Sequence, residues 1–183
     1  DRGTIYYKHY LFETFFKFAG WDTWISRPGR PSTYCALAGK PAKAGTGGDG
    51  RGWDFWFGFW VYGSGSLIAQ VQTKPGASNV EAVQTANTKF YDGAWHHYAF
   101  VYDETVPSIK LYFDYELAAE KTLTAPISRS IDDANNMLYL GTGGGAGSFE
   151  GKMDEIRYSR AALGPDDFLR TTRVPSGLML IVR

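Results

Sequence analysis

The stretch DGAWHHYAFVYD, residues 92–103, decides the fold together with the two segments that follow it. Its apolar and aromatic part, Ala94 to Tyr102, has the length of a β-strand and ends at the polar pair Asp103-Glu104. Aromatic and β-branched residues favour pleated strands. Two further segments of this character follow and are joined by a tight turn at Asp114-Tyr115, which predicts a hairpin: Ser108 to Asp114 and Glu116 to Leu123.

Segments of the same kind recur along the chain, separated by turns rich in Gly and Pro. They are Ile5 to Tyr10, Leu11 to Phe18, Tyr34 to Leu37, Trp53 to Tyr62, Ser66 to Thr73, Asn79 to Thr85, Met137 to Leu140 and Phe149 to Ser159. One helical turn is expected near Pro165, which suits an early helical position. Many short strands with turn residues between them are typical of a jelly roll. We therefore predict one all-β domain over residues 1–183, a jelly-roll β-sandwich of two antiparallel sheets with one short helical turn.

The composition excludes several classes of function. Nineteen basic and nineteen acidic residues give a formal net charge of zero, which leaves no basic surface for nucleic acid and no polybasic patch for a membrane. No apolar run approaches the roughly 20 residues that span a bilayer, so no membrane insertion is expected. Cys35 is the single cysteine. It excludes an internal disulfide and is expected to be a small core residue.

The order and spacing of several stretches resemble laminin-G-like modules of the concanavalin A-like lectin/glucanase superfamily. These stretches are residues 12–17, 92–103, 109–114, 138–141, 149–158 and 160–163. The resemblance extends over Leu11 to Leu169 and implies a jelly-roll module of a larger extracellular or cell-surface protein. Such modules usually carry Asp-Gly at the hairpin tip, where this chain has Asp114-Tyr115. Because a non-Gly residue at positive φ is costly, a turn of another type is expected here.

The stretch Trp53 to Tyr62 is the most informative about function. As a strand, it places five apolar residues on one face, which suits a core. Its other face carries Asp54, Trp56, Gly58, Trp60 and Tyr62. Indole rings stack on pyranoses, and Asp and Tyr hydrogen-bond sugars, so Asp54, Trp56, Trp60 and Tyr62 are the predicted carbohydrate-binding residues. The alternative is that loops cover this second face.

The pair His96-His97 does not predict a metal or catalytic site. Adjacent residues of a strand point to opposite faces, so the two imidazoles cannot reach one ion. We expect Trp95 in the core and one histidine on the outer face.

The pair Asp154-Glu155 does not predict glycoside hydrolysis. On a regular strand, Glu150 and Asp154 share a face about 13 Å apart, farther than either glycosidase geometry of about 5 to 9.5 Å. Glu155 is expected on the other face with Met153 and Arg157. We expect the pair to tie this strand to neighbouring loops, and the chain is predicted not to be an enzyme.

A calcium site is also predicted. Laminin-G and pentraxin relatives often bind Ca²⁺ at the rim of the sandwich through Asp, Asn and backbone carbonyls, and the ion takes about 6 to 8 oxygens. The stretch from Asp132 to Asn136 has the densest supply of such groups, and Asp132, Asp133 and Asn135 are the predicted ligands. Asp49 and Asp54 are further candidates, and the alternative for all of them is a solvated turn.

These residues and the resemblance predict a non-catalytic, lectin-like module that binds an oligosaccharide or glycan. We expect it to be attached to a secreted bacterial enzyme or surface protein. The alternatives are a protein-binding adhesion module that uses rim loops, a structural spacer, and a glycan-cleaving enzyme, which would need converging carboxylates.

Overall fold

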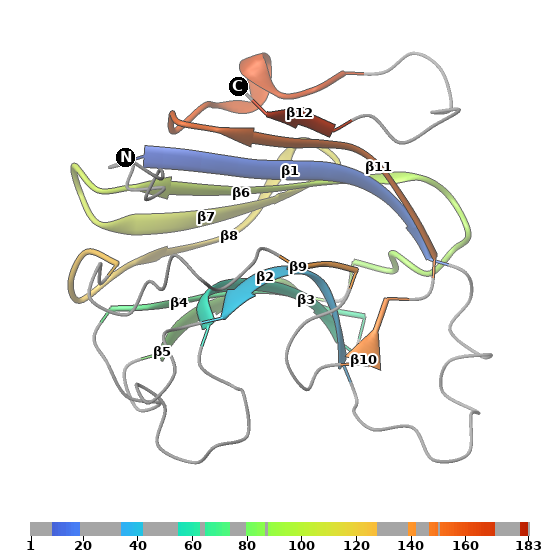
Figure 1. The fold of residues 1–183 in the computed structure, drawn as a ribbon, viewed down its shortest axis with the longest axis horizontal. Coiled ribbons are helices and arrows are strands. Elements are labelled where there is room, and N and C mark those ends of the chain that lie inside the picture. The colour runs from blue at the N-terminus through green and yellow to red at the C-terminus, as the bar shows by residue number, and fades with distance from the viewer. Residues whose placement is uncertain are drawn as a thin grey trace.

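The computed structural model describes residues 9–18, 34–41, 55–62, 65–73, 80–86, 88–127, 139–141, 147–149, 151–170 and 180–182. Two layers of β-strands make up this part of the chain (Figure 1). Sheet A has the strand order β12-β11-β1-β6-β7-β8, and sheet B has the order β10-β2-β3-β4-β5, with β9 paired to β2. The strands are β1 His9–Phe18, β2 Tyr34–Pro41, β3 Phe55–Tyr62, β4 Leu67–Gln72, β5 Val80–Gln84, β6 His96–Asp103, β7 Ser108–Phe113, β8 Glu116–Thr122, β9 Tyr139–Leu140, β10 Gly147–Ser148, β11 Gly151–Ser159 and β12 Leu180–Val182.

The predicted fold class, an all-β jelly-roll sandwich, is confirmed. Neighbouring strands pair antiparallel except at two short edge pairings, β11 with β12 and β2 with β10, which are parallel. The predicted helical turn is the 3₁₀ helix η3, Pro165–Asp167, with Pro165 at its start. Proline suits this place because the first amide of a helix has no partner within the helix. The described part of the chain contains no helix with the length and apolar character needed to cross a bilayer.

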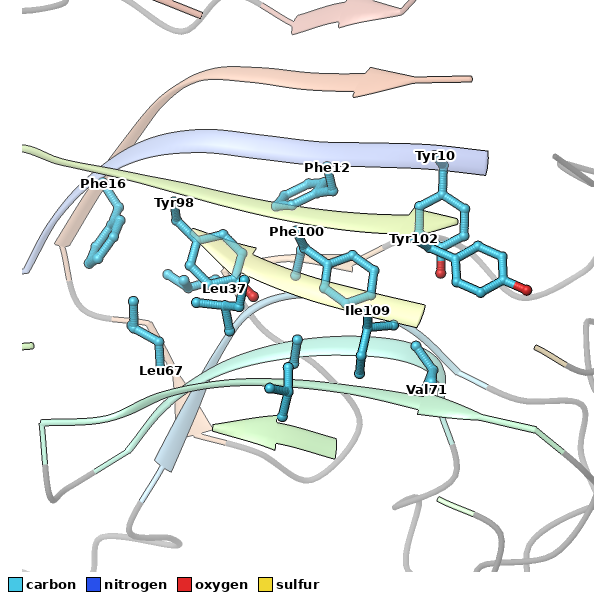
Figure 2. Close-up of a cluster of buried hydrophobic side chains, with 14 of the residues drawn as sticks. Tyr10, Phe12, Phe16, Leu37, Leu67, Val71, Tyr98, Phe100, Tyr102 and Ile109 are labelled. Carbon is cyan, nitrogen blue, oxygen red and sulfur yellow. The ribbon is translucent and has the colours of Figure 1, made fainter. Parts of the chain in front are cut away.

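The core lies between the two sheets, and β1 and β6 supply most of its aromatic rings (Figure 2). Tyr10 and Phe12 of β1 pair with Tyr102 and Phe100 of β6, and all four side chains are at most 2% exposed. The rings of Tyr10 and Tyr102 lie 5.2 Å apart. Burial of each large apolar side chain contributes about 1.5–3 kcal/mol. Sheet B closes the core from below with Leu37, Ala38, Leu67, Ala69, Val71 and Val83.

Glu81 on β5 joins the edges of the two sheets. Its Oε1 accepts hydrogen bonds from the backbone N–H (3.0 Å) and hydroxyl (2.6 Å) of Thr124, which follows β8. Its Oε2 lies 3.4 Å from Lys121 Nζ on β8. Burial raises the pKa of Glu81, but the Thr124 hydrogen bonds and Lys121 outweigh it, so the pKa is lowered. The ionised carboxylate therefore clamps β5 to the end of β8.

The first strand differs from the prediction. The segments expected at Ile5 to Tyr10 and Leu11 to Phe18 are not separate, because β1 runs through Tyr10 and Leu11 without a break. The pairing with β6 is continuous across both residues, which keeps the strand extended. Residues 5–8 lie outside the described part of the chain.

The faces of β11 also differ from the prediction, because the strand is bulged. Glu155 has φ of 49°, and the register with β1 shifts opposite it. An extra residue in a strand reverses the alternation beyond it. Asp154 and Arg157 therefore share the outer face of sheet A, opposite Phe15 and Glu13. The expectation that Arg157 shares a face with Met153 is wrong.

Candidate functional site

Strand β3 carries the predicted sugar-binding residues Trp56, Trp60 and Tyr62 and lies inside sheet B, between β2 and β4. The partners of positions 57, 59 and 61 on β4 are Val71, Ala69 and Leu67, which are fully buried in the core. Since partners across a sheet share a face, positions 58, 60 and 62 belong to the outer face of sheet B. The register of β3 with β2 shifts between Phe55 and Phe57, at Trp56, so alternation does not decide the face of that residue. The predicted strand is present over Phe55–Tyr62, and the sugar-binding role stays a prediction.

Two glycines and an alanine lie with Gln70 in one row across this outer face. Gly58 pairs with Gly39 of β2 on one side and with Gln70 of β4 on the other, and Gln70 pairs with Ala82 of β5. Gly39 is buried, Gln70 is half-buried and Ala82 is exposed, so the row is closed at its β2 end and open at its β5 end. The next row runs from Trp60 through Ile68 to Gln84.

The other predicted ligand residues lie outside the described part of the chain. Asp54 precedes β3, and Asp132, Asp133 and Asn135 precede β9. Asp49 is outside it as well, as is the side chain of Cys35. Within the described ranges, no group of three or more His, Cys, Asp or Glu residues is arranged to hold a metal ion.

His96, at the start of β6, lies between two aspartates. Its Nδ1 is 2.8 Å from Asp114 Oδ2, and its Nε2 is 3.0 Å from Asp92 Oδ1. Burial lowers the pKa of His96, but the hydrogen bonds to the two carboxylates outweigh it, and the pKa is raised. Asp92 also accepts a hydrogen bond from the Ala94 N–H, which is the main reason that its pKa is lowered.

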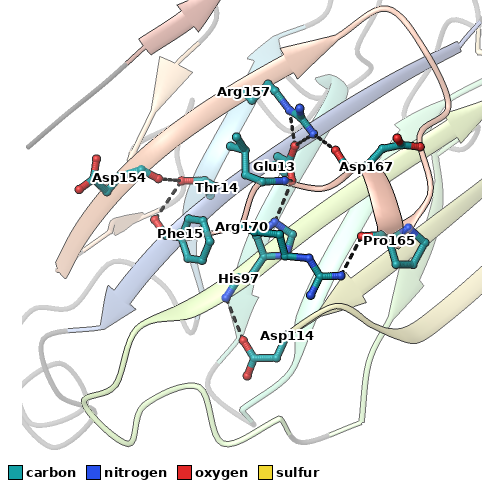
Figure 3. A network of polar contacts seen from close by, with 11 residues as sticks. Glu13, Thr14, Phe15, His97, Asp114, Asp154, Arg157, Pro165, Asp167 and Arg170 are labelled. Atoms are coloured by element: carbon teal, nitrogen blue, oxygen red, sulfur yellow. Dashed lines mark hydrogen bonds and ion pairs between the residues drawn. The ribbon is translucent and has the colours of Figure 1, made fainter. Parts of the chain in front are cut away.

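His97 points to the opposite face, into a buried polar network around Glu13 (Figure 3). Oε2 of Glu13 lies 2.8 Å from His97 Nε2 and accepts the N–H of Leu169 at 2.9 Å. Oε1 of Glu13 accepts hydrogen bonds from the guanidinium of Arg157. Glu13 is fully buried and His97 is 1% exposed. Two donors on each oxygen fill the acceptor sites of the carboxylate, so Glu13 has no free acceptor for a substrate. The Nδ1 atom of His97 is buried without a hydrogen-bond partner.

The hairpin turn between β7 and β8 covers this network from one side. Asp114 and Tyr115 have φ of 49° and 74°, the pattern of a type I′ turn. The expectation of another turn type is therefore wrong. The Tyr115 ring stacks on His97 with 4.5 Å between centroids, and the Arg170 guanidinium lies 3.9 Å above the same tyrosine ring. These contacts, with the hydrogen bond from His97 N–H to Asp114 Oδ1 (2.9 Å), offset the cost of the turn.

The segment 163–170 covers the network from the other side. Phe168 is 4% exposed and packs on Tyr112 and His97. Arg157 donates to the carbonyl of Asp167 (2.6 Å), and Arg170 donates to the carbonyl of Pro165 (3.0 Å). The outer face of sheet A at His97 is therefore an internal interface.

Two sequence expectations about the neighbourhood of these histidines are settled. The opposite orientation of His96 and His97 is confirmed, but both are buried because Phe113, Tyr115 and Phe168 cover their rings. Trp95 is half-buried and not in the core, so that expectation is wrong.

Asp154 stabilises the bulge of β11. Its Oδ1 accepts the N–H of Glu155 at 2.8 Å, and its carbonyl accepts the hydroxyl of Thr14 at 3.0 Å (Figure 3). Asp154 is 3% exposed. Its described contacts are thus local to β11 and β1.

Glu13 joins three segments of the chain but was not among the residues predicted from the sequence to be important. The available signal was its position, a carboxylate inside the otherwise apolar run Leu11 to Phe18. A carboxylate there must be paired with a cation and hydrogen-bond donors if the strand is central. The partners Arg157 and His97 could not be read from the sequence, because the bulge at Glu155 brings Arg157 to that face.

The fold and family agree. A laminin-G-type family model, described as the concanavalin A-like lectin/glucanases superfamily, matches residues 20–167. The chain belongs to this superfamily, as its sequence motifs indicate. No curated protein sequence matches the chain.

Solved structures with the same fold include sialic-acid-related and laminin proteins. The CBM40 module of the Ruminococcus gnavus IT-sialidase, bound to α2,6-sialyllactose, is 16% identical with a TM-score of 0.66 and covers 88% of this chain and 81% of its own. Mouse laminin α1 LG4-5 is 15% identical (TM-score 0.56; 85% of this chain and 36% of that one). The leech intramolecular trans-sialidase, complexed with 2,7-anhydro-Neu5Ac, is 16% identical (0.64; 87% and 22%). At these identities the likeness shows the fold alone.

Proposed function

We propose that the chain is a non-catalytic carbohydrate-binding module of an extracellular or cell-surface protein, and that its glycan lies on the outer face of sheet B over β3 and β4. The observation that carries the proposal is the register of β3. In this register, Gly58 and Trp60 are partners of Gln70 and Ile68 of β4, of which Gln70 is half-buried and Ile68 is buried. Membership of a superfamily that includes lectins supports it.

The chemistry of this face suits a sugar. Two indole rings can stack on pyranose rings, and Gln70 offers both an amide donor and a carbonyl acceptor for hydroxyl groups. Gly58 and Ala82, on either side of Gln70, leave room for a ring between the tryptophan positions. At about 3.3 Å per residue, Trp56 and Trp60 are ~13 Å apart, which suits a short oligosaccharide.

The absence of catalysis is part of the proposal. Glycoside hydrolysis uses two carboxylates that flank the scissile bond. The buried carboxylates of the described residues are Glu13, Glu81 and Asp154, and each has structural partners: Arg157 and His97, Thr124 and Lys121, and the Glu155 N–H. A carboxylate committed in this way is poorly placed to give or take a proton from a substrate.

Calcium binding by Asp132, Asp133 and Asn135 is a second part of the proposal. Two carboxylates and an amide carbonyl are hard oxygen donors of the kind that Ca²⁺ prefers. Calorimetric titration of the chain with CaCl₂ should give one binding event, and D132N/D133N should abolish it. If the double variant binds Ca²⁺ as the parent does, these ligands are wrong, whatever the glycan result.

The test of function is a glycan array, run in CaCl₂ and again in chelator, with 3′- and 6′-sialyllactose among the probes. We expect binding to a defined glycan, which W56A and W60A should each weaken by about tenfold or more, the usual loss for a stacking ring. A82W should block the open end of the Gly58 row without touching the core. A118W is the matched control, an exposed alanine on β8 of the other sheet.

Each outcome decides something. Equal loss in A82W and A118W would mean that the new ring harms the protein and not the site, and W56A and W60A would then carry the test. Full binding by folded W56A, W60A and A82W would overturn the site. An empty array under both conditions would overturn the carbohydrate proposal and favour the protein-binding alternative. Turnover of any oligosaccharide would overturn the non-catalytic part.

A further inference from the structure

A polar depression lies on the outer face of sheet A, at the end of the sandwich where β6 turns into β7. Its volume is about 530 Å³, within the ~300–1,000 Å³ of ordinary ligand sites. Its lining residues come from β6, β7, β8 and the turn between the first two: Asp103, Val106, Ser108, Lys110, Glu120, Lys121 and Thr122.

The strand register shows how the floor of this depression is built. Ser108 pairs with Asp103 on one side and with Thr122 on the other, while Lys110 pairs with Glu120. Ile109 and Leu111 alternate with these residues and are fully buried in the core. Ser108 and Lys110 therefore belong to the outer face. Two adjacent rows of polar side chains thus form a floor on rigid strands.

The polar groups of the floor are mixed and balanced. Ser108 and Thr122 supply hydroxyls, Asp103 and Glu120 supply carboxylates, and Lys110 supplies an ammonium group. Oδ1 of Asp103 accepts the Thr105 N–H at 2.8 Å and lies 3.0 Å from His9 Nδ1 of β1. The Thr105 N–H is the main reason that the pKa of Asp103 is lowered, so this carboxylate is ionised at neutral pH.

The remaining two lining residues add apolar surface. Lys121 is held 3.4 Å from Glu81, so it contributes its aliphatic stem more than its charge. Val106 is 63% exposed at the rim. A large apolar side chain beside a polar floor provides the two kinds of contact that a sugar ring needs.

We propose that this depression binds a neutral hexopyranose, as a saccharide site separate from the one on sheet B. An anionic ligand would meet Asp103 and Glu120, and a cationic ligand would meet Lys110, at an unfavourable distance. A neutral polyol can donate to both carboxylates and accept from the lysine while its C–H face rests on Val106. This site does not depend on the proposed function, because none of the residues that line it belongs to sheet B.

The test is a ¹⁵N-NMR titration of the whole chain with four neutral probes, the methyl glycosides of glucose, galactose, mannose and N-acetylglucosamine. We expect saturable shifts of the Val106, Ser108 and Thr122 amides with at least one probe, and no matching shifts at Gln70 and Ala82. T122W fills the depression from an exposed position and should weaken this binding by about tenfold or more. A118W, on the same strand outside the depression, should bind as the parent does.

Three results would overturn the inference. The first is no saturable shift with any of the four probes. The second is an unchanged affinity in folded T122W, which would place the sugar elsewhere. The third is tighter binding of methyl glucuronide than of methyl glucoside, because Asp103 and Glu120 should repel the carboxylate of the glucuronide. Signals at Gln70 and Ala82 report on the sheet B site, so failure of one proposal is distinguishable from failure of the other.

Discussion

The outer faces of the two sheets are built in different ways. On sheet A, the buried carboxylate of Glu13 is bound by His97, Arg157 and the Leu169 N–H under the segment 163–170. On sheet B, the described row of Gly39, Gly58, Gln70 and Ala82 has one long side chain, that of Gln70, and opens to solvent at β5. Polar residues on an outer face of the sandwich therefore do not by themselves form a binding site. What matters is whether the partners of a polar group already lie within the chain.

We expect E13A to cause the greatest loss of stability. Removing the carboxylate leaves Arg157, His97 and the Leu169 N–H without their acceptor. Loss of one partner of a buried ion pair costs about 3–5 kcal/mol in the free energy of unfolding. Urea denaturation would measure it. E116A is the matched control on the exposed edge of β8 and should stay within about 0.5 kcal/mol of the parent.

A small effect of E13A would contradict the assignment of this face to stability. Equal losses in E13A and E116A would do the same. In either case the Glu13 network would not be needed for stability, and the outer faces of the two sheets would no longer differ in this respect.

The hairpin tip gives the next largest effect. Y115A removes the stack on His97 and the contact with Arg170, for a loss of about 1–2 kcal/mol. Y115G makes the same deletion but relieves the positive φ, which costs a non-glycine residue about 1–2 kcal/mol. Thermal unfolding should therefore rank Y115G above Y115A. If Y115A is as stable as Y115G, the turn is not strained at this position.

Strands β6, β7, β8 and β11 were predictable from sequence because each is a short aromatic or alternating run between turn residues, whereas β10 and β12 were not among the predicted strands. The prediction for β7, Ser108 to Asp114, differs from the structure by one residue, and the hairpin to β8 is present. Three features were not predictable. The bulge at Glu155 breaks the alternation on which face assignments rest, the tip at Asp114-Tyr115 is stabilised by distant residues, and Glu13 depends on partners from two other strands.

The predicted site was accessible to sequence reasoning only in part. The period-two pattern gave the two faces of β3 from Phe57 to Val61, because this part of the strand has a regular register with β4. At Trp56 the register with β2 shifts, which the pattern did not indicate. Gln70 and Ala82 were missed, because their place beside Gly58 is set by strand pairing, which the sequence of β3 alone does not contain.

The contribution of His96, at the rim of sheet A, to the free energy of unfolding should depend on pH. The raised pKa of His96 means that the protonated imidazole stabilises the folded state. That contribution is complete below the ordinary value of 6.5 and is lost as pH rises through the higher folded pKa. The difference in free energy of unfolding between parent and H96N should therefore shrink from about pH 5.5 to pH 8.5. A difference that is constant over this range would contradict the two-aspartate arrangement.

The smallest expected effect on stability is that of A82W on sheet B. An exposed substitution away from buried contacts changes stability by about 0.5 kcal/mol or less. E13A and A82W should therefore have opposite kinds of effect. E13A should lower stability, and A82W should lower glycan binding while leaving the urea midpoint nearly unchanged. A large stability loss in A82W would mean that the open end of the row is a packed surface.

The central place of β1 in sheet A has a consequence for the order in which the protein is made. Its strand neighbours are β6 and β11, so Glu13 must wait for His97, 84 residues later, and for Arg157, 144 residues later. At about 5–20 residues per second, a ribosome completes the last of these partners roughly 7–30 s after β1. Strands paired across such distances fold slowly. Until β6 emerges, Phe12 and Phe16 have no strand of sheet A to pair with, and we expect the nascent chain to depend on chaperones until β11 completes the neighbours of β1.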